Sequence, residues 1–265
     1  MMSILSVTAR AVLFAALSIA GSSVALSQQP APPKSDIAQR IEKALASDIR
    51  TTEERARDVL ERKPVQTLEL FGLTPDMRVV ELFPGGGWYT KILAPVLAEK
   101  GKLYLAMGAS RLAPKLKEWK LDQVEVVDVK ADLKPTAQYG IFTATAMEIP
   151  VKDIDMVLTF RNYHNMTPEA RALLNREVFR MLRRGGIYGI VDHTRRHNEP
   201  ASAETWRRID PVLVIKEVQA AGFQLVDSSD LHYRPDDELK YDSQRESIKG
   251  YSDRFTLKFI KPATR

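Results

Sequence analysis

The chain has 265 residues, of which 44% are hydrophobic and 28% charged, as in an ordinary globular protein. Its formal net charge is +5, but basic and acidic residues are interspersed and no basic block carries interleaved aromatics, so nucleic acid is not an expected partner. The absence of cysteine excludes disulfides, thiolate catalysis and a lipid-modified N-terminal cysteine, and the 4 histidines alone predict no metal site.

The first 35 residues differ in kind from the rest of the chain. A positive charge precedes the short apolar core 11–21, and a run of small residues follows it. This order is typical of a secretory signal, so we predict a signal peptide over residues 1–27 and a proline-rich tether over residues 28–35. The apolar core is shorter than the about 20 residues that a bilayer span needs. We therefore expect a periplasmic or secreted protein with no stable membrane insertion; an uncleaved membrane anchor is the alternative.

An N-terminal helical cap is expected over residues 36–72. Apolar residues recur at helical spacing from Asp36, and a second helical pattern runs from Thr52 to about Lys63. Pro64 is expected to open a third helix, which ends at Phe71-Gly72. Residues 73–265 then form the main domain.

A glycine turn between a strand and a helix is the most informative feature of the chain. The strand that includes Val79 carries Glu81 near its carboxyl end, the turn Pro84-Gly85-Gly86-Gly87 follows, and a helix is expected from Trp88 to Glu99. Glycine leaves bare backbone against which a ligand can lie, and the first N–H groups of a helix favour a carboxylate or phosphate. The turn is therefore a candidate cofactor site.

Strands and helices alternate through the rest of the chain. The expected strands are Lys102–Met107, Asp155–Phe160, Ile187–Val191, Phe223–Asp227 and Arg254–Ile260. The expected helices are Arg111–Trp119, Pro168–Leu182 and one that is capped by Asp210-Pro211 and ends at Ala221-Gly222. Arg183–Gly186 is expected to be a turn. Val124–Val129 and Tyr139–Met147 both look extended, and the sequence does not say which is the core strand.

This alternation indicates an α/β fold, with a doubly wound, mainly parallel sheet covered by helices on both faces. The last two strands lack an intervening helix long enough for a parallel crossover. We therefore expect them to pair as a hairpin, which makes the final strand antiparallel.

The chain resembles the class I S-adenosylmethionine (SAM) dependent methyltransferases, nearest to a bacterial group of exported predicted methyltransferases of unassigned substrate. The resemblance rests on four segments in the same order: Pro84–Thr90, Leu158–Asn165, Gly185–His193 and Ser252–Phe259. It implies a seven-stranded sheet with an antiparallel last strand, and SAM as the cofactor.

The same resemblance implies which residues hold SAM. Glu81, Pro84, Gly85, Gly86 and Gly87 match the motif that binds the methionine end in that family. The chain also departs from the family at three places. Phe83 replaces the usual first glycine, no acid ends the second strand at Ala106-Met107-Gly108, and Thr145 or a neighbour stands where an aspartate often approaches the adenine.

Polar side chains follow the strand Asp155–Phe160, where ligands bind in open α/β sheets. Histidine is the residue type whose ordinary pKa suits proton transfer near neutral pH, so His164 is the candidate general base. Asn162 or Tyr163 would position the acceptor by hydrogen bonding. The alternative is that His164 and Asn165 only satisfy the local backbone and cap the next helix.

Further polar and aromatic residues have two interpretations each. Asp192 and His193 end the next strand and would either orient a substrate or form a solvated turn. Trp88 and Tyr89 would either shield a sulfonium by cation–π contact or form core or wall, which we favour for Trp88. Asp210 is interpreted as a helix cap.

These residues predict a SAM-dependent methyltransferase that acts on a small-molecule acceptor. The alternative is an exported, non-catalytic ligand-binding protein that keeps the fold. A nicotinamide oxidoreductase ranks third, because the dinucleotide fingerprint needs a third glycine where Thr90 stands.

Overall fold

The computed structural model describes residues 34–263. The predicted signal peptide and residues 28–33 of the predicted tether lie outside the described residues. Within 34–263, no helix has both the length and the apolar character needed to span a membrane.

The predicted N-terminal helices are present, and their ends have clear local causes. They are α1 (Asp36–Leu45), α2 (Thr52–Arg57), the π-helical turn η1 (Asp58–Arg62) and α3 (Pro64–Phe71). Thr51 and Glu54 form a capping box at the start of α2, where each side chain accepts a hydrogen bond from the other residue's backbone N–H. Lys63 has a φ of 41°, which ends η1 and lets Pro64 begin α3. The single helix expected over 52–63 is therefore an α-helix followed by a π turn.

The main sheet has seven strands, as the resemblance implied. The strands are β1 (Arg78–Leu82), β2 (Lys102–Ala106), β3 (Glu125–Val126), β8 (Ile154–Phe160), β9 (Leu182–His193), β10 (Gln224–Ser229) and β11 (Arg254–Ile260), in the spatial order β10-β11-β9-β8-β1-β2-β3. The pairs β9·β8, β8·β1, β1·β2 and β2·β3 are parallel. β11 lies antiparallel between β10 and β9, which confirms the predicted final hairpin.

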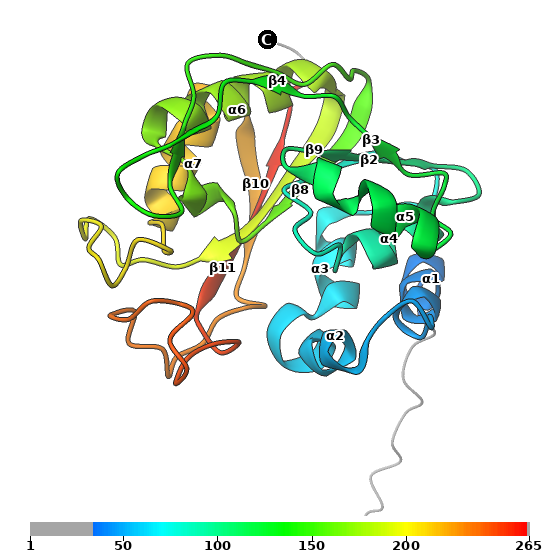
Figure 1. Ribbon diagram of the computed structural model, residues 1–265, viewed down its shortest axis with the longest axis horizontal. Coiled ribbons are helices and arrows are strands. Elements are labelled where there is room, and N and C mark those ends of the chain that lie inside the picture. The colour runs from blue at the N-terminus through cyan, green and yellow to red at the C-terminus, as the bar shows by residue number, and fades with distance from the viewer. Residues whose placement is uncertain (1–33, 264–265) are drawn as a thin grey trace, which may run out of the picture. The chain divides into compact units, whose positions relative to one another are not determined.

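Helices cover both faces of this sheet (Figure 1). One face carries α6 (Pro168–Met181) and α7 (Pro211–Ala220), and the other carries α1, α3, α4 (Thr90–Leu97) and α5 (Ala113–Glu118). The short 3-10 turns η2 (Ala109–Leu112) and η3 (Tyr163–Asn165) precede α5 and α6. Each face buries its own apolar cluster, so the core consists of two layers separated by the sheet.

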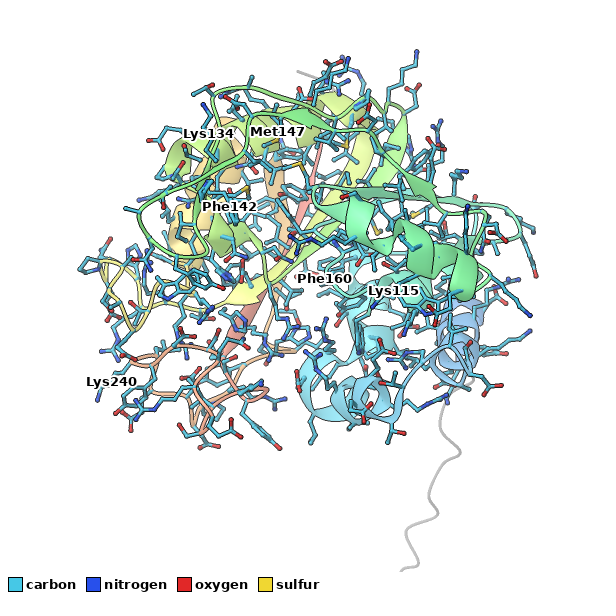
Figure 2. The ribbon with its side chains drawn as sticks, viewed as in Figure 1. Lys115, Lys134, Phe142, Met147, Phe160 and Lys240 are labelled. Carbon is cyan, nitrogen blue, oxygen red and sulfur yellow. The ribbon has the colours of Figure 1, made fainter. Side chains whose placement is uncertain are left out.

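The segment between β2 and β8 supplies only a short edge strand to the sheet. β3 comes from the first of the two extended stretches, and it pairs with β2 over two residues. The remainder forms β4 (Lys130–Ala131), β5 (Lys134–Pro135), β6 (Phe142–Thr143) and β7 (Met147–Glu148), which pair as β4·β7 and β5·β6 in two small sheets. β6 and β7 contact α6, and Figure 2 labels Lys134, Phe142 and Met147 along this segment.

The turn expected at 183–186 is wrong, because β9 begins earlier than predicted. β9 pairs Leu182 with Ile154, then shifts register before Ile187 pairs with Met156. Lys261 exchanges backbone hydrogen bonds with the intervening glycines, donating to Gly186 at 2.9 Å and accepting from Gly185 at 2.8 Å. The segment is a bulged start of the strand, held by the chain that follows β11.

The chain order reverses between β1 and β8. From β1 the chain continues to β2 and β3 on one side, and it then returns to place β8 on the other side of β1. In open α/β sheets, ligands bind outside the carboxyl ends of the strands at such a switch point. The carboxyl ends of β1 and β8 are therefore where a site is expected.

Candidate functional site

A cavity of about 390 Å³ lies at this switch point. Its walls come from the glycine turn and its neighbours, from the end of β8 and the run that follows it, and from His193 at the end of β9. The lining residues of the first two segments are Glu81, Phe83, Pro84, Gly85, Gly86, Trp88, Tyr89, Phe160, Arg161, Asn162, His164 and Asn165. Residues of α2 and η1 line it from the N-terminal cap, and Ser243 and Gln244 line it from the loop before β11. The cap and that loop lie at the same end of the sheet (Figure 1).

The glycine turn presents bare backbone to the cavity at two of its three glycines. A Cβ atom on Gly85 or Gly86 would meet no atom within 4 Å, and both residues line the cavity together with Pro84. Gly87 differs, because a Cβ there would lie 2.8 Å from the Trp119 ring, and Gly87 does not line the cavity. Gly87 thus serves close packing and the turn itself, with a φ of 82°, while Gly85 and Gly86 form the surface that faces the cavity.

Phe83 shows why glycine is usual at its position in the resembled family. Its φ is 53°, in the left-handed region that side chains rarely adopt. The Nδ2 group of Asn162 donates to the carbonyl oxygen of Phe83 at 3.2 Å and to that of Phe160 at 2.9 Å. This amide therefore joins the end of β8 to the glycine turn. Asn162 lines the cavity, but its N–H groups hold the backbone.

Glu81 is a buried acid at the base of the cavity. It is 3% exposed, and the Thr90 hydroxyl donates to its Oε2 at 2.6 Å. Burial raises the pKa of Glu81 to about 8, and the Thr90 hydrogen bond and the nearby Arg62 charge oppose part of that rise. A cationic group in the cavity would favour the ionised carboxylate.

His164 and Asp192 form a buried pair. The Nδ1 atom of His164 lies 2.6 Å from Oδ1 of Asp192, and the backbone N–H of His164 donates to Oδ2 at 3.0 Å. Asp192 is fully buried and also accepts from the backbone N–H of His193 at 2.7 Å, so it is not part of a solvated turn. His164 lines the cavity, and within residues 34–263 its Nε2 makes no hydrogen bond. A proton on Nδ1 directed at Asp192 leaves Nε2 as an acceptor, as a general base requires.

His193 also lines the cavity, but it is held differently. Its Nδ1 lies 2.9 Å from the Ser252 hydroxyl. Burial lowers the pKa of His193 well below its ordinary value, and the positive charge of Arg254 lowers it further. His193 is therefore a neutral ring at physiological pH and contributes hydrogen bonding to the site.

Tyr163 does not line the cavity, so the prediction that it positions the acceptor is wrong. It is fully buried, its hydroxyl donates to Glu217 at 3.0 Å, and the hydroxyl accepts from the Asn175 amide at 2.7 Å. The 3-10 turn η3 directs Tyr163 into the core and His164 to the cavity. The neighbouring Asn165 donates to Asn162 at 3.3 Å and lines the cavity.

Aromatic rings form one wall of the cavity. Tyr89 stacks on Phe160 with ring centroids 3.5 Å apart, and Figure 2 labels Phe160 at the centre of the molecule. Trp88 is 6% exposed and donates from Nε1 to the carbonyl of Glu54 at 3.1 Å. The Arg62 guanidinium lies over its ring at 4.4 Å. Trp88 is a wall residue, and its cation–π partner belongs to the protein.

The other two departures from the resembled family are the missing acid after β2 and the residue at position 145. Met107 and Gly108 follow β2 with φ values of 60° and 72°, and neither lines the cavity. The backbone N–H of Thr145 donates to Asp132 at 2.8 Å, and its hydroxyl donates to the same carboxylate. The contact between Asp132 and Thr145 was not predicted, because the residues around Asp132 show no pattern that places it beside Thr145.

Two further expectations concern residues outside the cavity. Asp210 caps α7, because its Oδ1 accepts from the backbone N–H of Val212 at 2.8 Å; its Oδ2 lies 2.8 Å from Nδ1 of His197. In the part of the chain that the structure describes, no cluster of three His, Asp or Glu side chains is placed to hold a metal ion.

Arg62 and Arg161 line the cavity and were not assigned a role from the sequence. Arg161 directly follows β8 in the same polar run as His164, so its place was open to prediction. Arg62 belongs to the helical cap, and only the fold brings it to the glycine turn.

Comparison with known proteins identifies the fold. No family model and no curated protein sequence matches the chain. Among solved structures, a SAM-dependent methyltransferase from Aquifex aeolicus is 18% identical with a TM-score of 0.53, over 84% of this chain and 98% of that one. A putative sarcosine dimethylglycine methyltransferase from Galdieria sulphuraria is 14% identical with a TM-score of 0.52, over 80% and 86%.

The structure of the [4+2]-cyclase SpnF is also similar to this chain, with 15% identity and a TM-score of 0.52 over 86% of this chain and 93% of that one. The chain thus has the Rossmann-like methyltransferase fold. Because this fold also carries a cyclase, the activity has to be argued from the site.

Proposed function

We propose that this protein is a SAM-dependent methyltransferase that acts on a small-molecule acceptor. One observation carries the proposal: bare backbone at Gly85 and Gly86 lines a cavity beside the buried acid Glu81, at the switch point of a methyltransferase fold. The fold supplies the scaffold, and the open space over these two glycines supplies room for a ligand.

The residues present fit the amino-acid end of SAM. Glu81 is a buried carboxyl whose raised pKa would fall next to an ammonium group. The backbone N–H groups of Gly85 and Gly86, which line the cavity, suit a carboxylate. SAM, when bound, supplies an electrophilic methyl group on a sulfonium.

The chain itself supplies alignment and proton removal. The walls formed by Phe83, Trp88, Tyr89 and Phe160 restrict the positions that an acceptor can take, which favours in-line attack. His164 accepts the acceptor's proton at Nε2. Asp192 holds the ring in the required tautomer and stabilises the imidazolium that forms.

Binding measurements on the full chain test the proposal without knowledge of the acceptor. Isothermal titration calorimetry with SAM and S-adenosylhomocysteine should show binding at micromolar concentration. Gly86→Leu should abolish it, because the side chain fills the open space over the turn, and Gly86 has no positive φ that would strain the fold. Gly86→Ala is the matched control with a smaller side chain and should bind more weakly than wild type but better than Gly86→Leu.

Absence of SAM binding at millimolar concentration in a folded wild type would refute the enzyme. The alternative non-catalytic ligand-binding protein would then be the better description.

We also propose that the chain is exported. The support is the charge, apolar core and small-residue run of its first 27 residues. A fusion of residues 1–35 to a periplasm-specific reporter should give an active reporter. A reporter that stays in the cytoplasm would overturn export while leaving the methyltransferase proposal intact.

A further inference from the structure

Arg62 is a buried cation whose side chain has no hydrogen-bonding partner among residues 34–263. It ends η1, is 8% exposed and lines the cavity. Its guanidinium lies over the rings of Trp88 and Tyr89, at 4.4 Å and 5.5 Å from their centroids. Within residues 34–263 this guanidinium donates no hydrogen bond, and its Nε is fully buried. A buried guanidinium with unused donors is unfavourable unless another group satisfies it.

Arg161 enters the same cavity from the sheet. It follows β8 with a φ of 61°, an unusual backbone conformation for a side chain of this size. Its Nε is buried without a partner among the described residues, and its nearest carboxylate, on Glu61, lies 3.9 Å from Nη1. Strained backbone of this kind gathers at functional sites, where it places a side chain that the site needs.

The carboxylates around these arginines are already shared. Glu61 lies 3.0 Å from Nε of Arg57, 3.9 Å from Arg161 and 4.0 Å from Arg254. Three guanidinium groups therefore share this one carboxylate.

The other acids near the cavity have partners of their own. Glu54 pairs with Lys91 at 3.0 Å and Asp58 pairs with Arg50 at 2.6 Å. Asp192 is hydrogen-bonded to His164. Glu81 also lines the cavity, but burial raises its pKa to about 8, so it is largely protonated near neutral pH. The cavity therefore carries an excess of positive charge within the described residues.

The effect on titration agrees with this geometry. Burial lowers the pKa of Arg62 well below its ordinary value, and the charge of Arg161 lowers it further. Burial lowers the pKa of Arg254 to about 9, again with a contribution from Arg161. An anion in the cavity would relieve this repulsion.

We propose that the acceptor is an anionic small molecule, whose carboxylate or phosphate group is bound between Arg62 and Arg161. This inference rests on the methyltransferase function proposed above and names the class of its substrate. The two guanidinium groups provide several unused N–H donors, which suit a planar carboxylate or a phosphate. The aromatic wall beside them accommodates the apolar body of such a molecule.

The carboxylate of SAM is the competing source of the same chemistry. The glycine turn already offers the backbone N–H groups of Gly85 and Gly86 for that carboxylate. Arg62 and Arg161 come from other elements, η1 and the end of β8, and therefore offer a second anion site. The experiment has to separate these two sources.

Titration of the full chain with benzoate and with inorganic phosphate, followed by calorimetry, tests the inference directly. At least one of these anions should bind, and Arg62→Leu or Arg161→Gln should weaken it by about tenfold to a hundredfold, as for the loss of a charge-assisted hydrogen bond. Arg111→Gln is the matched control, because Arg111 is exposed on η2, away from the cavity lining, and the change in charge is the same.

Thermal unfolding gives a second readout that a purely structural arginine would not show. Arg62→Leu keeps apolar contact with the Trp88 ring and removes an unpaired buried charge, so its melting temperature should equal or exceed that of wild type. If Arg62→Leu does not fold, Arg161→Gln decides the result.

Four outcomes are informative. Weaker anion binding with unchanged SAM affinity supports the inference. Equal loss of anion and SAM affinity in Arg62→Leu overturns it and assigns the arginine to the methionine carboxylate. Absence of binding of either anion to wild type at millimolar concentration also overturns it. Anion binding by a wild type that binds no SAM refutes the methyltransferase function alone, and supports the anion site.

Discussion

Replacing Glu81 by Gln should make the protein more stable at alkaline pH and change little at acidic pH. The carboxyl has an ordinary pKa of 4.5, and burial in the folded protein raises it to about 8. Gln has nearly the same shape and keeps an oxygen that accepts the Thr90 hydrogen bond. Only the ability to ionise is lost.

The magnitude follows from the two pKa values. Below pH 4.5 both folded and unfolded chains hold the proton, and the stabilisation from the neutral buried acid is fully present. Between 4.5 and about 8 only the folded protein holds the proton, so the free energy of unfolding of the wild type falls as pH rises. Each pH unit costs about 1.4 kcal/mol, which gives about 3 kcal/mol at neutral pH and at most about 5 kcal/mol above the folded pKa.

Urea denaturation of wild type and Glu81→Gln across this pH range measures the effect. The stability difference should grow in favour of the variant as pH rises and level off above the folded pKa. The effects of other titrating groups cancel in the difference between the two proteins. Thr90→Val provides a second check: loss of the hydroxyl donor raises the pKa of Glu81 further, so the decline should extend to higher pH. A difference that does not vary with pH would refute the raised pKa.

Three other changes have specific expected results. Asp192→Asn should remove the downfield Nδ1–H proton resonance of His164 from the NMR spectrum and lower the rate of transfer by about 10²–10⁴-fold, and an unchanged tautomer would contradict the proposed pair. Gly87→Ala should cost about 1–3 kcal/mol in urea denaturation, because its Cβ would lie 2.8 Å from Trp119 at a φ of 82°, and a variant as stable as wild type would show that this packing is looser than described. Tyr163→Phe should cost about 1–3 kcal/mol, because the buried Asn175 amide loses the oxygen to which it donates, and SAM affinity should be unchanged in calorimetry. A loss of affinity would place the phenol in the cavity.

The fold followed from patterns that are local in the chain. The predicted bounds of the last strand, Arg254–Ile260, agree with β11, because alternation and flanking turns mark a central strand clearly. The final hairpin was predictable because no crossover helix separates the last two strands. The edge strand β3 was not predictable, because it makes only two residue pairs with β2 and is too short to show an alternation of apolar and polar residues.

The site was predictable only where one segment holds all of its parts. The glycine turn with Glu81 is such a segment, and so is the run after β8. Within that run, the sequence does not say that η3 directs Tyr163 inward and His164 to the cavity, because both directions suit an aromatic ring. Arg62 was missed because its position depends on how the helical cap packs over the sheet, which is a property of the tertiary structure.

Phe83 gives this cavity a wall that a glycine would not provide. The chain tolerates an unfavourable backbone angle there, of order 1–3 kcal/mol, and gains a ring that narrows the space beside Pro84. Substitution of this single residue would relax the backbone and enlarge the chamber together. Phe83 is therefore the natural starting point for engineering the protein to accept bulkier molecules.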